Sequence, residues 1–288
     1  MMSDKVEIAV IGGTGLYTMP GISDRQVLKL ETPWGDPSGE IVVGALQGKR
    51  VAFLARHGHG HRLSPSEVPY RANIYALKSL GVRFIISVNA CGSLRKDFLP
   101  GDIVIPDQLV DHTRRRPAGS FFGRDLVAHI SVADPFCETL RRILTHAINS
   151  CGARVHSGGT FIIIEGPRFS TRGESRIYRQ WGCSIIGMTA CPEAFLAREA
   201  EIAYASLAHV TDFDVWKDEV VTVEKVMAVM QENLRVIQSG IVAAVEQIGP
   251  DTPSHAHTAL DDAILVERDQ VPADLLAKLG PVVARRFS

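Results

Sequence analysis

Short apolar runs alternate with amphipathic segments over most of the chain. The runs are rich in β-branched residues and typical of strands covered on both faces; they span 6–11, 51–55, 83–88, 103–105, 160–164, 183–188 and 202–210. Between them, apolar residues at three- and four-residue spacing predict helices over 69–80, 136–151, 172–181, 192–200 and 222–247. This alternation predicts an α/β fold, a single three-layer α/β/α domain.

The alternating pattern ends near residue 249. No linker rich in Pro, Gly or Ser interrupts residues 1–249, so we expect this region to form one domain. The tail, residues 250–288, is more polar and predicts a short helix near 272–279. We expect the tail to pack on the same domain or on a neighbouring subunit.

Composition narrows the class of protein. The chain has 288 residues, is 45% hydrophobic and 22% charged, and carries a formal net charge of -1. This balance argues against nucleic acid or a membrane surface as the main partner. The charged start is unlike a signal peptide, and the five scattered cysteines form no C-x-x-C motif. We therefore expect a cytoplasmic protein with reduced thiols.

Two aspartates follow the last predicted strand. Asp212 and Asp214 come after the 202–210 run, and β alternation would place residues two apart on one side. Two neighbouring carboxylates suit a ligand with a proton acceptor beside an amino group, such as N7 and the 6-amino group of adenine. An isolated Asp-x-Asp is more often a solvated pair. Here other polar segments also follow apolar runs, and strand carboxyl ends collect at the ligand crevice of an open α/β sheet.

Those other segments carry groups that bind anions. The glycine-rich turn at 12–15 can bring backbone N–H groups and the Thr14 hydroxyl to an anion. Arg56 can hold a phosphate through two N–H groups, and His57 can donate further bonds. Asn89, with the backbone after it, can complete the cradle. Thr189 offers a hydroxyl at the end of another strand.

Each segment also has a rival interpretation. The turn at 12–15, with Glu31 downstream, could begin a dinucleotide-binding motif of an NAD(P)-dependent oxidoreductase, but Thr18 occupies the third glycine position. Histidines at 57, 59 and 61 could suggest a metal site, but the segment holds no cysteine or carboxylate, so no metal is expected. Met188 at a strand end is more often a core residue.

Taken together, the segments resemble the S-methyl-5'-thioadenosine phosphorylase branch of the trimeric purine nucleoside phosphorylase family. The resemblance covers residues 6 to 248 and rests on eight blocks in the right order: 12–16, 55–58, 90–94, 100–104, 165–170, 187–189, 192–194 and 211–217. It implies the nucleoside phosphorylase fold with a mixed central sheet. It also implies a homotrimer that binds a nucleoside and phosphate, with no cofactor besides phosphate as co-substrate.

The resemblance implies a role for each candidate residue. It implies that Asp212 and Asp214 bind adenine and are the catalytic residues. The other substrate contacts are implied to be Met188, His61 and Phe169. The residues implied to hold phosphate are Thr14, Arg56, His57, Asn89, Ala90 and Thr189. Those implied to set specificity are Ser170 for the base and Val223, Val226 and Met227 for an apolar 5' slot. His129 resembles a residue that a neighbouring subunit lends to that slot.

The implied reaction is the phosphorolysis of S-methyl-5'-thioadenosine to adenine and 5-methylthioribose 1-phosphate, in purine and methionine salvage. Asn89 departs from the threonine usual in this branch, which leaves a broader phosphorylase for adenosine or 6-oxopurine nucleosides as the alternative. A non-catalytic purine-binding protein is a more remote alternative. The roles of His59, Cys91 and the tail stay open.

Overall fold

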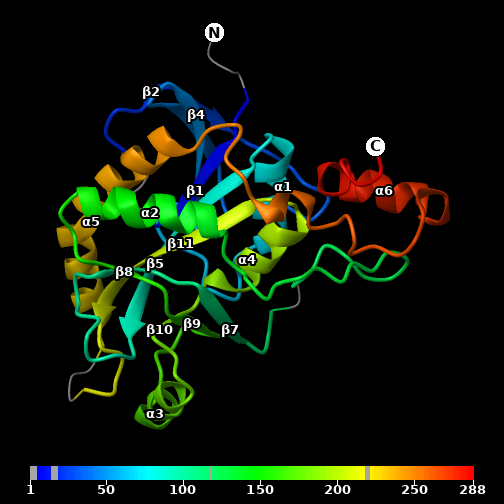
Figure 1. Ribbon diagram of the computed structural model, residues 1–288. Coiled ribbons are helices and arrows are strands. Elements are labelled where there is room, and N and C mark those ends of the chain that lie inside the picture. The colour runs from blue at the N-terminus through cyan, green and yellow to red at the C-terminus, as the bar shows by residue number, and fades with distance from the viewer. Residues whose placement is uncertain (1–4, 14–18, 117–118, 218–220) are drawn as a thin grey trace.

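The computed structural model describes residues 5–13, 19–116, 119–217 and 221–288 (Figure 1). Within these ranges the strands are β1 (Ile8–Gly12), β2 (Ser23–Leu28), β3 (Ile41–Leu46), β4 (Lys49–Ala55), β5 (Phe84–Ser93), β6 (Ile103–Ile105), β7 (Gln108–His112), β8 (Val155–Ser157), β9 (Thr160–Ile164), β10 (Ile185–Gly187) and β11 (Ala203–Asp212). The α-helices are α1 (Tyr70–Ser79), α2 (Glu138–Ser150), α3 (Arg172–Gln180), α4 (Ala190–Glu199), α5 (Val223–Gln247) and α6 (Ala273–Leu279).

The strands of the described chain form one mixed sheet. Its main path runs β2-β3-β4-β1-β5-β10-β9-β7, and β11 pairs with both β5 and β6, the latter also pairing with β8. β1 is parallel to β4 and β5, whereas β10 is antiparallel to β5. The expected mixed central sheet is confirmed.

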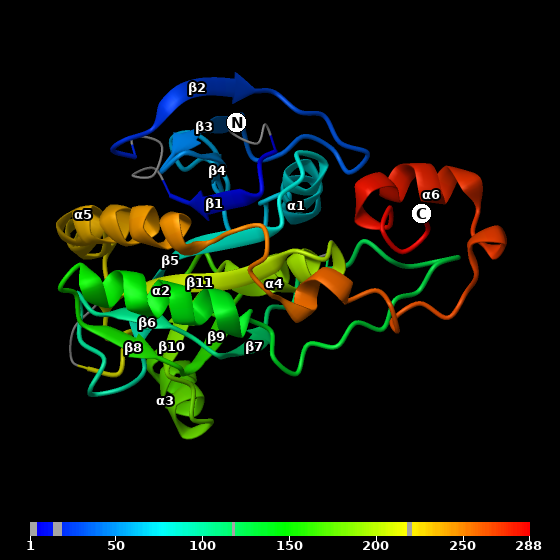
Figure 2. The same cartoon turned by 45° about the horizontal axis from the view of Figure 1, so that its top comes forward.

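Alternate residues of β1 show that helices cover both faces of the sheet. Ile8 and Val10 pack in one cluster with α2 and α5, while Ala9 and Ile11 pack in another with α1 and α4. Figure 2 shows α2 and α5 side by side on their face of the sheet. Residues buried on both faces explain why the strands read as continuous apolar runs. The three-layer α/β/α prediction is confirmed.

Strand β5 changes partner along one edge. β11 pairs with β5 from Phe84 to Gly92. On the opposite edge, β1 pairs with residues 84–87 and β10 pairs with residues 92–93. Residues 88–91 have no strand partner on that edge within the described structure. Because β1 and β10 run in opposite directions relative to β5, their carboxyl ends point towards each other across this gap.

Several strands differ from the sequence prediction. β5 continues to Ser93, beyond the predicted end at residue 88, and β11 continues to Asp212, beyond the predicted end at residue 210. The strands β2, β3, β7 and β8 were not predicted. β2 has the sequence SDRQVL and is largely exposed, and β7 reads QLVDH. Such polar strands at the ends of the sheet path lack the apolar run from which a buried strand is recognised.

The tail forms short helical turns and then α6, close to the predicted helix at 272–279. Its apolar residues, including Leu260, Leu279 and Phe287, belong to the same core cluster as α1 and α4. Arg285 of the tail donates two hydrogen bonds to Glu201, from Nε at 2.7 Å and from Nη2 at 2.6 Å. Among the described residues, no helix is long and apolar enough to cross a membrane.

Candidate active site

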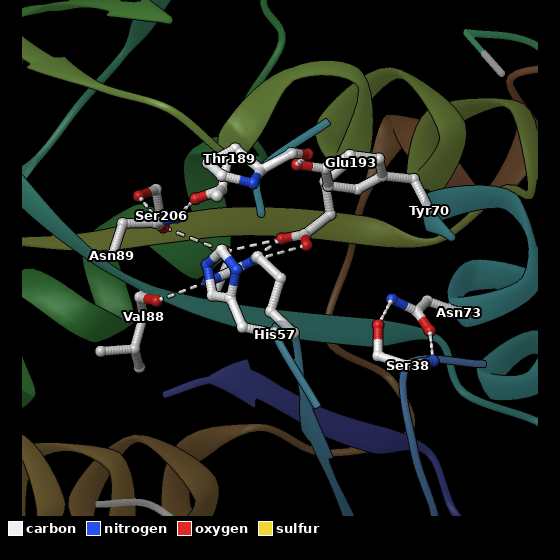
Figure 3. Close-up of polar contacts among 12 residues, drawn as sticks. Ser38, His57, Tyr70, Asn73, Val88, Asn89, Thr189, Glu193 and Ser206 are labelled. Carbon is white, nitrogen blue, oxygen red and sulfur yellow. Dashed lines mark hydrogen bonds and ion pairs between the residues drawn. The ribbon is translucent and has the colours of Figure 1, made fainter. Parts of the chain in front are cut away.

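Three strand ends and the middle of β5 deliver the candidate anion-binding residues to the gap beside β5. Gly13 follows β1, Arg56 and His57 follow β4, Asn89 lies within β5, and Thr189 follows β10. The Arg56 N–H bonds the carbonyl of Gly12, which ties the end of β4 to the end of β1. Thr14 and Gly15 lie outside the described residues. Figure 3 shows His57, Asn89 and Thr189 close together in this region.

Arg56 is buried, at 2% exposure, and its guanidinium is held by protein groups. Nε donates to Glu193 Oε2 at 2.7 Å and Nη2 donates to Glu193 Oε1 at 2.9 Å. Nη2 also donates to Ser87 Oγ at 2.6 Å, and Nη1 donates to the Val88 carbonyl at 3.0 Å. The expectation that Arg56 grips an anion through two N–H groups is therefore wrong for this geometry, because Glu193 occupies that side of the side chain.

Asn89 connects this ion pair to Thr189. Its Oδ1 accepts a hydrogen bond from Ser206 at 2.9 Å and lies 3.0 Å from the Ser87 hydroxyl, whose single proton it shares with Glu193 Oε1. Its Nδ2 donates to Thr189 Oγ1 at 3.0 Å, as Figure 3 shows. Thr189 stands at the N-cap of α4, yet its side chain makes no capping bond. The Thr189 hydroxyl thus has a fixed acceptor role towards Asn89, and its own proton can be donated to an anion.

His57 is held as a neutral ring. Its Nδ1 lies 2.8 Å from the Leu63 carbonyl, which can only accept, so Nδ1 carries the proton. Burial, followed by the nearby Arg56 charge, lowers the pKa of His57 to about 4. The neutral ring therefore presents an unprotonated Nε2, which accepts a hydrogen bond. This differs from the expected donor role, and it suits the O–H of a protonated phosphate.

The turn around His57 depends on glycine. Gly58 has φ +70°, and a Cβ there would lie 2.9 Å from the Ser38 carbonyl oxygen. Asn73 fixes Ser38 by accepting its N–H at 2.8 Å and donating to its hydroxyl at 2.8 Å (Figure 3). The turn brings His61 over His57, with ring centroids 4.2 Å apart. His61 is itself exposed.

The two aspartates reach a common region by a turn. A register shift separates Val210 from Asp212, β11 ends at Asp212, and Asp214 has φ +50°. The Asp214 N–H donates to Asp212 Oδ1 at 2.7 Å, while the Thr211 hydroxyl donates to Asp212 Oδ2 at 2.7 Å. Simple β alternation is therefore the wrong reason for their proximity, which a short side-chain-to-backbone turn produces instead.

Both carboxyl groups are shifted towards the protonated form. Burial raises the pKa of Asp212, against the opposing hydrogen bonds from Thr211 and Asp214. Burial also raises the pKa of Asp214, opposed mainly by the nearby Ser175 hydroxyl, and the charge of Asp212 adds to the rise. Within the described part of the chain, the buried atoms Asp214 Oδ2, Ser170 Oγ and Ser175 Oγ have no partner of good hydrogen-bond geometry. These groups are available to a polar ligand.

A cavity of about 340 Å³ opens beside the aspartates. Besides Asp212 and Asp214 it is lined by Thr211, Phe213, Pro100 and a set from the start of α5 and just before it: Val221, Lys225, Ala228 and Val229. The α5 residues that line it are thus different from the predicted ones. Val223 and Met227 are 63% and 43% exposed, and Val226 is half-buried.

The predicted 5' patch is not part of the protein core. The buried residues of α5 begin only at Ile237. Val223, Val226 and Met227 therefore lie before the buried stripe of this helix. On a nearby turn, Met230 reaches within 3.9 Å of the Cβ position of Gly13. This side of α5 consequently borders Gly13, directly after β1.

Met188 borders the gap from the other side, and Phe169 lies three residues after the glycine that packs on it. Met188 lies directly after β10 and is half-buried. A Cβ on Gly166, which has φ +66°, would approach the Met188 sulfur within 2.5 Å. Glycine at 166 therefore lets the segment before Phe169 pack closely on Met188. Phe169 is 38% exposed and Ser170 is 8% exposed.

His129 lies far from the aspartates of its own chain. It belongs to the segment between β7 and α2, and its N–H bonds the Ala263 carbonyl of the tail at 2.8 Å. In Figures 1 and 2 this segment extends beside the tail, on the opposite side of the molecule from the start of α5. His129 is exposed. Within one chain the structure does not bring it to the other candidate residues.

Sequence reasoning missed several residues of this site. Glu193, Ser87 and Tyr204 surround Arg56, and Ser175 approaches Asp214. The only available signal was the block at 192–194, which contains Glu193 but says nothing about its partner. Ser87 and Tyr204 lie inside strands, where a polar residue in an apolar run is the only sign of a buried contact. Among the described residues, no group of three or more His, Cys, Asp or Glu could hold a metal ion.

Fold and site together define an α/β enzyme that joins an anion cradle to paired carboxyl groups. The chain belongs to the Phosphorylase superfamily, whose family model matches residues 7–246. It is 53% identical to an S-methyl-5'-thioadenosine phosphorylase of Chloroflexus aurantiacus, over 98% of each chain, and 49% identical to one of Geobacter sulfurreducens, over 96% of this chain and 97% of that one.

Solved structures agree with these relatives. A methylthioadenosine phosphorylase sourced from an antarctic soil metagenomic library superposes with a TM-score of 0.93, at 48% identity, over 97% of this chain and 99% of that one. A mutant of the adenosine/methylthioadenosine phosphorylase of Schistosoma mansoni, in complex with methylthioadenosine, superposes with a TM-score of 0.82, at 40% identity, over 86% and 93% of the two chains.

Proposed function

We propose that this protein is a pentosyltransferase that cleaves S-methyl-5'-thioadenosine with phosphate, releasing adenine and 5-methylthioribose 1-phosphate. The observation that carries the proposal is that two features meet on β5: Asn89 within the gap bonds Thr189, and Gly92, one residue beyond the gap, lies against Asp212 and Asp214. The hydrogen-bonding cradle around Thr189 suits phosphate, and the buried aspartates beside a cavity suit a 6-aminopurine. Near-full-length similarity to S-methyl-5'-thioadenosine phosphorylases supports the same reaction.

The reaction needs no protein nucleophile. A phosphate oxygen bonds to C1' of the ribose while the bond from C1' to N9 breaks and its electron pair passes to the purine. Catalysis then depends on positioning and electrostatics. In this proposal Arg56, Thr189 and the Ala90 backbone hold phosphate, together with Thr14, which lies outside the described residues. Phosphate is a co-substrate, and no other cofactor is required by these steps.

Protonation of the leaving base falls to the aspartates. Asp212, whose pKa burial raises, supplies a proton to N7 so that the purine does not leave as an anion. Asp214, whose Oδ2 makes no hydrogen bond of good geometry with the described residues, accepts from the 6-amino group. Ser170 is small enough to leave room for the purine base and offers it a hydroxyl group. A 6-oxopurine would leave these buried groups mismatched and so be rejected.

The remaining roles concern the sugar. Met188 offers an apolar face to the ribose, with Phe169 and His61 near the opening. The exposed patch Val223, Val226 and Met227 suits a 5'-methylthio group. His129, exposed in the segment between β7 and α2 and bonded to the tail, suits a neighbouring subunit's slot in a homotrimer.

A broader phosphorylase that accepts adenosine is the second candidate. It is favoured by Asn89 in place of the usual threonine, and one relative's name includes both adenosine and methylthioadenosine. Release of adenine or hypoxanthine from methylthioadenosine, adenosine and inosine, with and without phosphate, separates the candidates. We expect phosphate-dependent adenine release, fastest from methylthioadenosine. Release that does not depend on phosphate would contradict both.

A further inference from the structure

The Glu193 carboxylate is 1% exposed and lies within hydrogen-bond distance of four donor groups. Arg56 supplies two of them. The hydroxyls of Ser87 and Tyr204 supply the other two, each at 2.8 Å to Oε1. Arg56 and Glu193 thus form a buried ion pair in which the carboxylate offsets the guanidinium charge.

This pairing limits what Arg56 can offer to an anion. A guanidinium has five N–H groups in a fixed plane. Nε uses one on Glu193, Nη2 uses two on Glu193 and Ser87, and Nη1 uses one on Val88. One Nη1–H is left. Because the plane is fixed by Glu193, the direction of that last N–H is fixed as well.

A series of hydrogen-bonded side chains connects the same carboxylate to Thr189. Ser87 Oγ contacts both Glu193 Oε1 at 2.8 Å and Asn89 Oδ1 at 3.0 Å. Asn89 in turn donates to Thr189 Oγ1 and so orients the Thr189 hydroxyl. Figure 3 shows Glu193, Asn89 and Thr189 lying around one space. Two of the groups that face the anion are therefore oriented through one acid.

We propose that Glu193 is a positioning residue for phosphate. Its carboxylate offsets the Arg56 charge and fixes the direction of the one remaining Nη1–H of Arg56. Phosphate is therefore held at the reacting distance by directed hydrogen bonds, and it does not form a close ion pair with the guanidinium. The inference rests on the proposed function for its reaction, but its effect on anion binding is independent of turnover.

Glu193→Gln tests the proposal, since it keeps shape and removes the charge. The uncompensated Arg56 charge should bind anions more tightly. We expect sulfate affinity, measured by calorimetry, to rise at least ~3-fold and kcat to fall ~10- to 100-fold, with the KM for methylthioadenosine unchanged. A purely structural role predicts lower thermal stability with unchanged sulfate affinity and phosphate KM, and that result would overturn the proposal.

Glu201→Gln is the matched control. Glu201 is 3% exposed and is also held by two N–H groups of one arginine, Arg285, but it belongs to the contact between the tail and α4. We expect Glu201→Gln to lower stability without changing sulfate affinity or the phosphate KM. An equal change in both variants would show that the effect comes from general loosening, and would contradict the proposal.

Ser87→Ala decides the matter if Glu193→Gln does not fold. It breaks the link from Glu193 to Asn89 while the ion pair stays intact. We expect the phosphate KM to rise ~3- to 10-fold, the scale of one lost hydrogen bond, with the nucleoside KM unchanged. An unchanged phosphate KM would overturn the inference. Absence of phosphate-dependent adenine release from the unmodified protein would instead refute the proposed function, and sulfate calorimetry would still test Glu193.

Discussion

At the scale of single residues, the proposed reaction requires Asp212 to donate a proton to the leaving purine. Burial raises its pKa, so the carboxyl group stays protonated to higher pH than an ordinary aspartate. Asp212→Asn keeps the shape and removes the transferable proton. We expect kcat for adenine release to fall ~10²-fold or more.

Steady-state assay of methylthioadenosine turnover measures the effect of Asp212→Asn. Asp97→Asn serves as its control, since Asp97 is an exposed carboxylate paired with Arg95 away from the aspartates. Unchanged turnover in Asp212→Asn would refute its role as the proton donor.

Arg56 shows what the sequence could and could not predict about the site. Its position after a strand end was predictable from the local pattern, and so was its proximity to His57. Its partner was not, because Glu193 lies 137 residues away and comes close only through packing of α4 on the sheet. For His57, the protonated nitrogen depends on the Leu63 carbonyl, a contact of the folded turn.

At the scale of elements, the start of α5 sets the nucleoside preference in the proposed function. Val223 and Met227 are exposed, whereas the helix buries apolar side chains from Ile237 onwards. Burying a methylthio group there should contribute ~1–3 kcal/mol relative to a hydroxyl left partly unpaired. We expect methylthioadenosine to exceed adenosine by about 10- to 100-fold in kcat/KM.

Val226→His tests the same patch by giving a 5'-hydroxyl a partner. We expect it to narrow or reverse the preference for methylthioadenosine. Gln231→His, on an exposed position of the same helix, should leave the ratio unchanged. Equal kcat/KM for the two nucleosides in the unmodified protein would show that the patch does not meet the substrate.

Helix α4 contains a second buried acid, Glu199, which holds the segment between β7 and α2. It accepts the Ser120 hydroxyl at 2.7 Å and the Phe121 N–H at 2.6 Å. Burial raises the pKa of Glu199 to about 7, against those two bonds and Arg71. Its raised pKa means that the folded state binds the proton more tightly than the unfolded state does. The resulting stabilisation is fully present below about pH 4.5 and is lost as pH rises through 7.

Denaturant unfolding between pH 4.5 and 7 measures this contribution. The difference from the ordinary glutamate value corresponds to about 3 kcal/mol, at 1.36 kcal/mol per pKa unit. In Glu199→Gln we expect this decrease in the free energy of unfolding between pH 4.5 and 7 to be absent. An identical pH dependence in the variant and the unmodified protein would contradict the assignment.

At the scale of the whole molecule, most of the fold could be predicted from the sequence. The buried strands and the long helices follow from apolar runs and helical spacing. The outer strands β2 and β7 could not be recognised, since their stability comes from pairing with a neighbour already in the sheet. The division at residue 249, the cytoplasmic location and the trimer stay predictions.

The trimer prediction has a direct test in mixed assemblies. His129→Ala should lower kcat/KM for methylthioadenosine ~10-fold, the effect of one lost contact of about 1.4 kcal/mol. If a neighbour completes each site, joint refolding of His129→Ala and Asp212→Asn chains should give activity above the mean of the two parents. Activity equal to that mean, or a monomeric mass by light scattering, would contradict the shared site.

The central claim is that phosphate itself attacks the sugar. Phosphorus-31 NMR of a reaction with methylthioadenosine and limiting phosphate tests it most directly. The account predicts that inorganic phosphate is consumed and one sugar 1-phosphate appears for each adenine released. Adenine released while the inorganic phosphate signal stays constant would mean hydrolysis by water, and would contradict it.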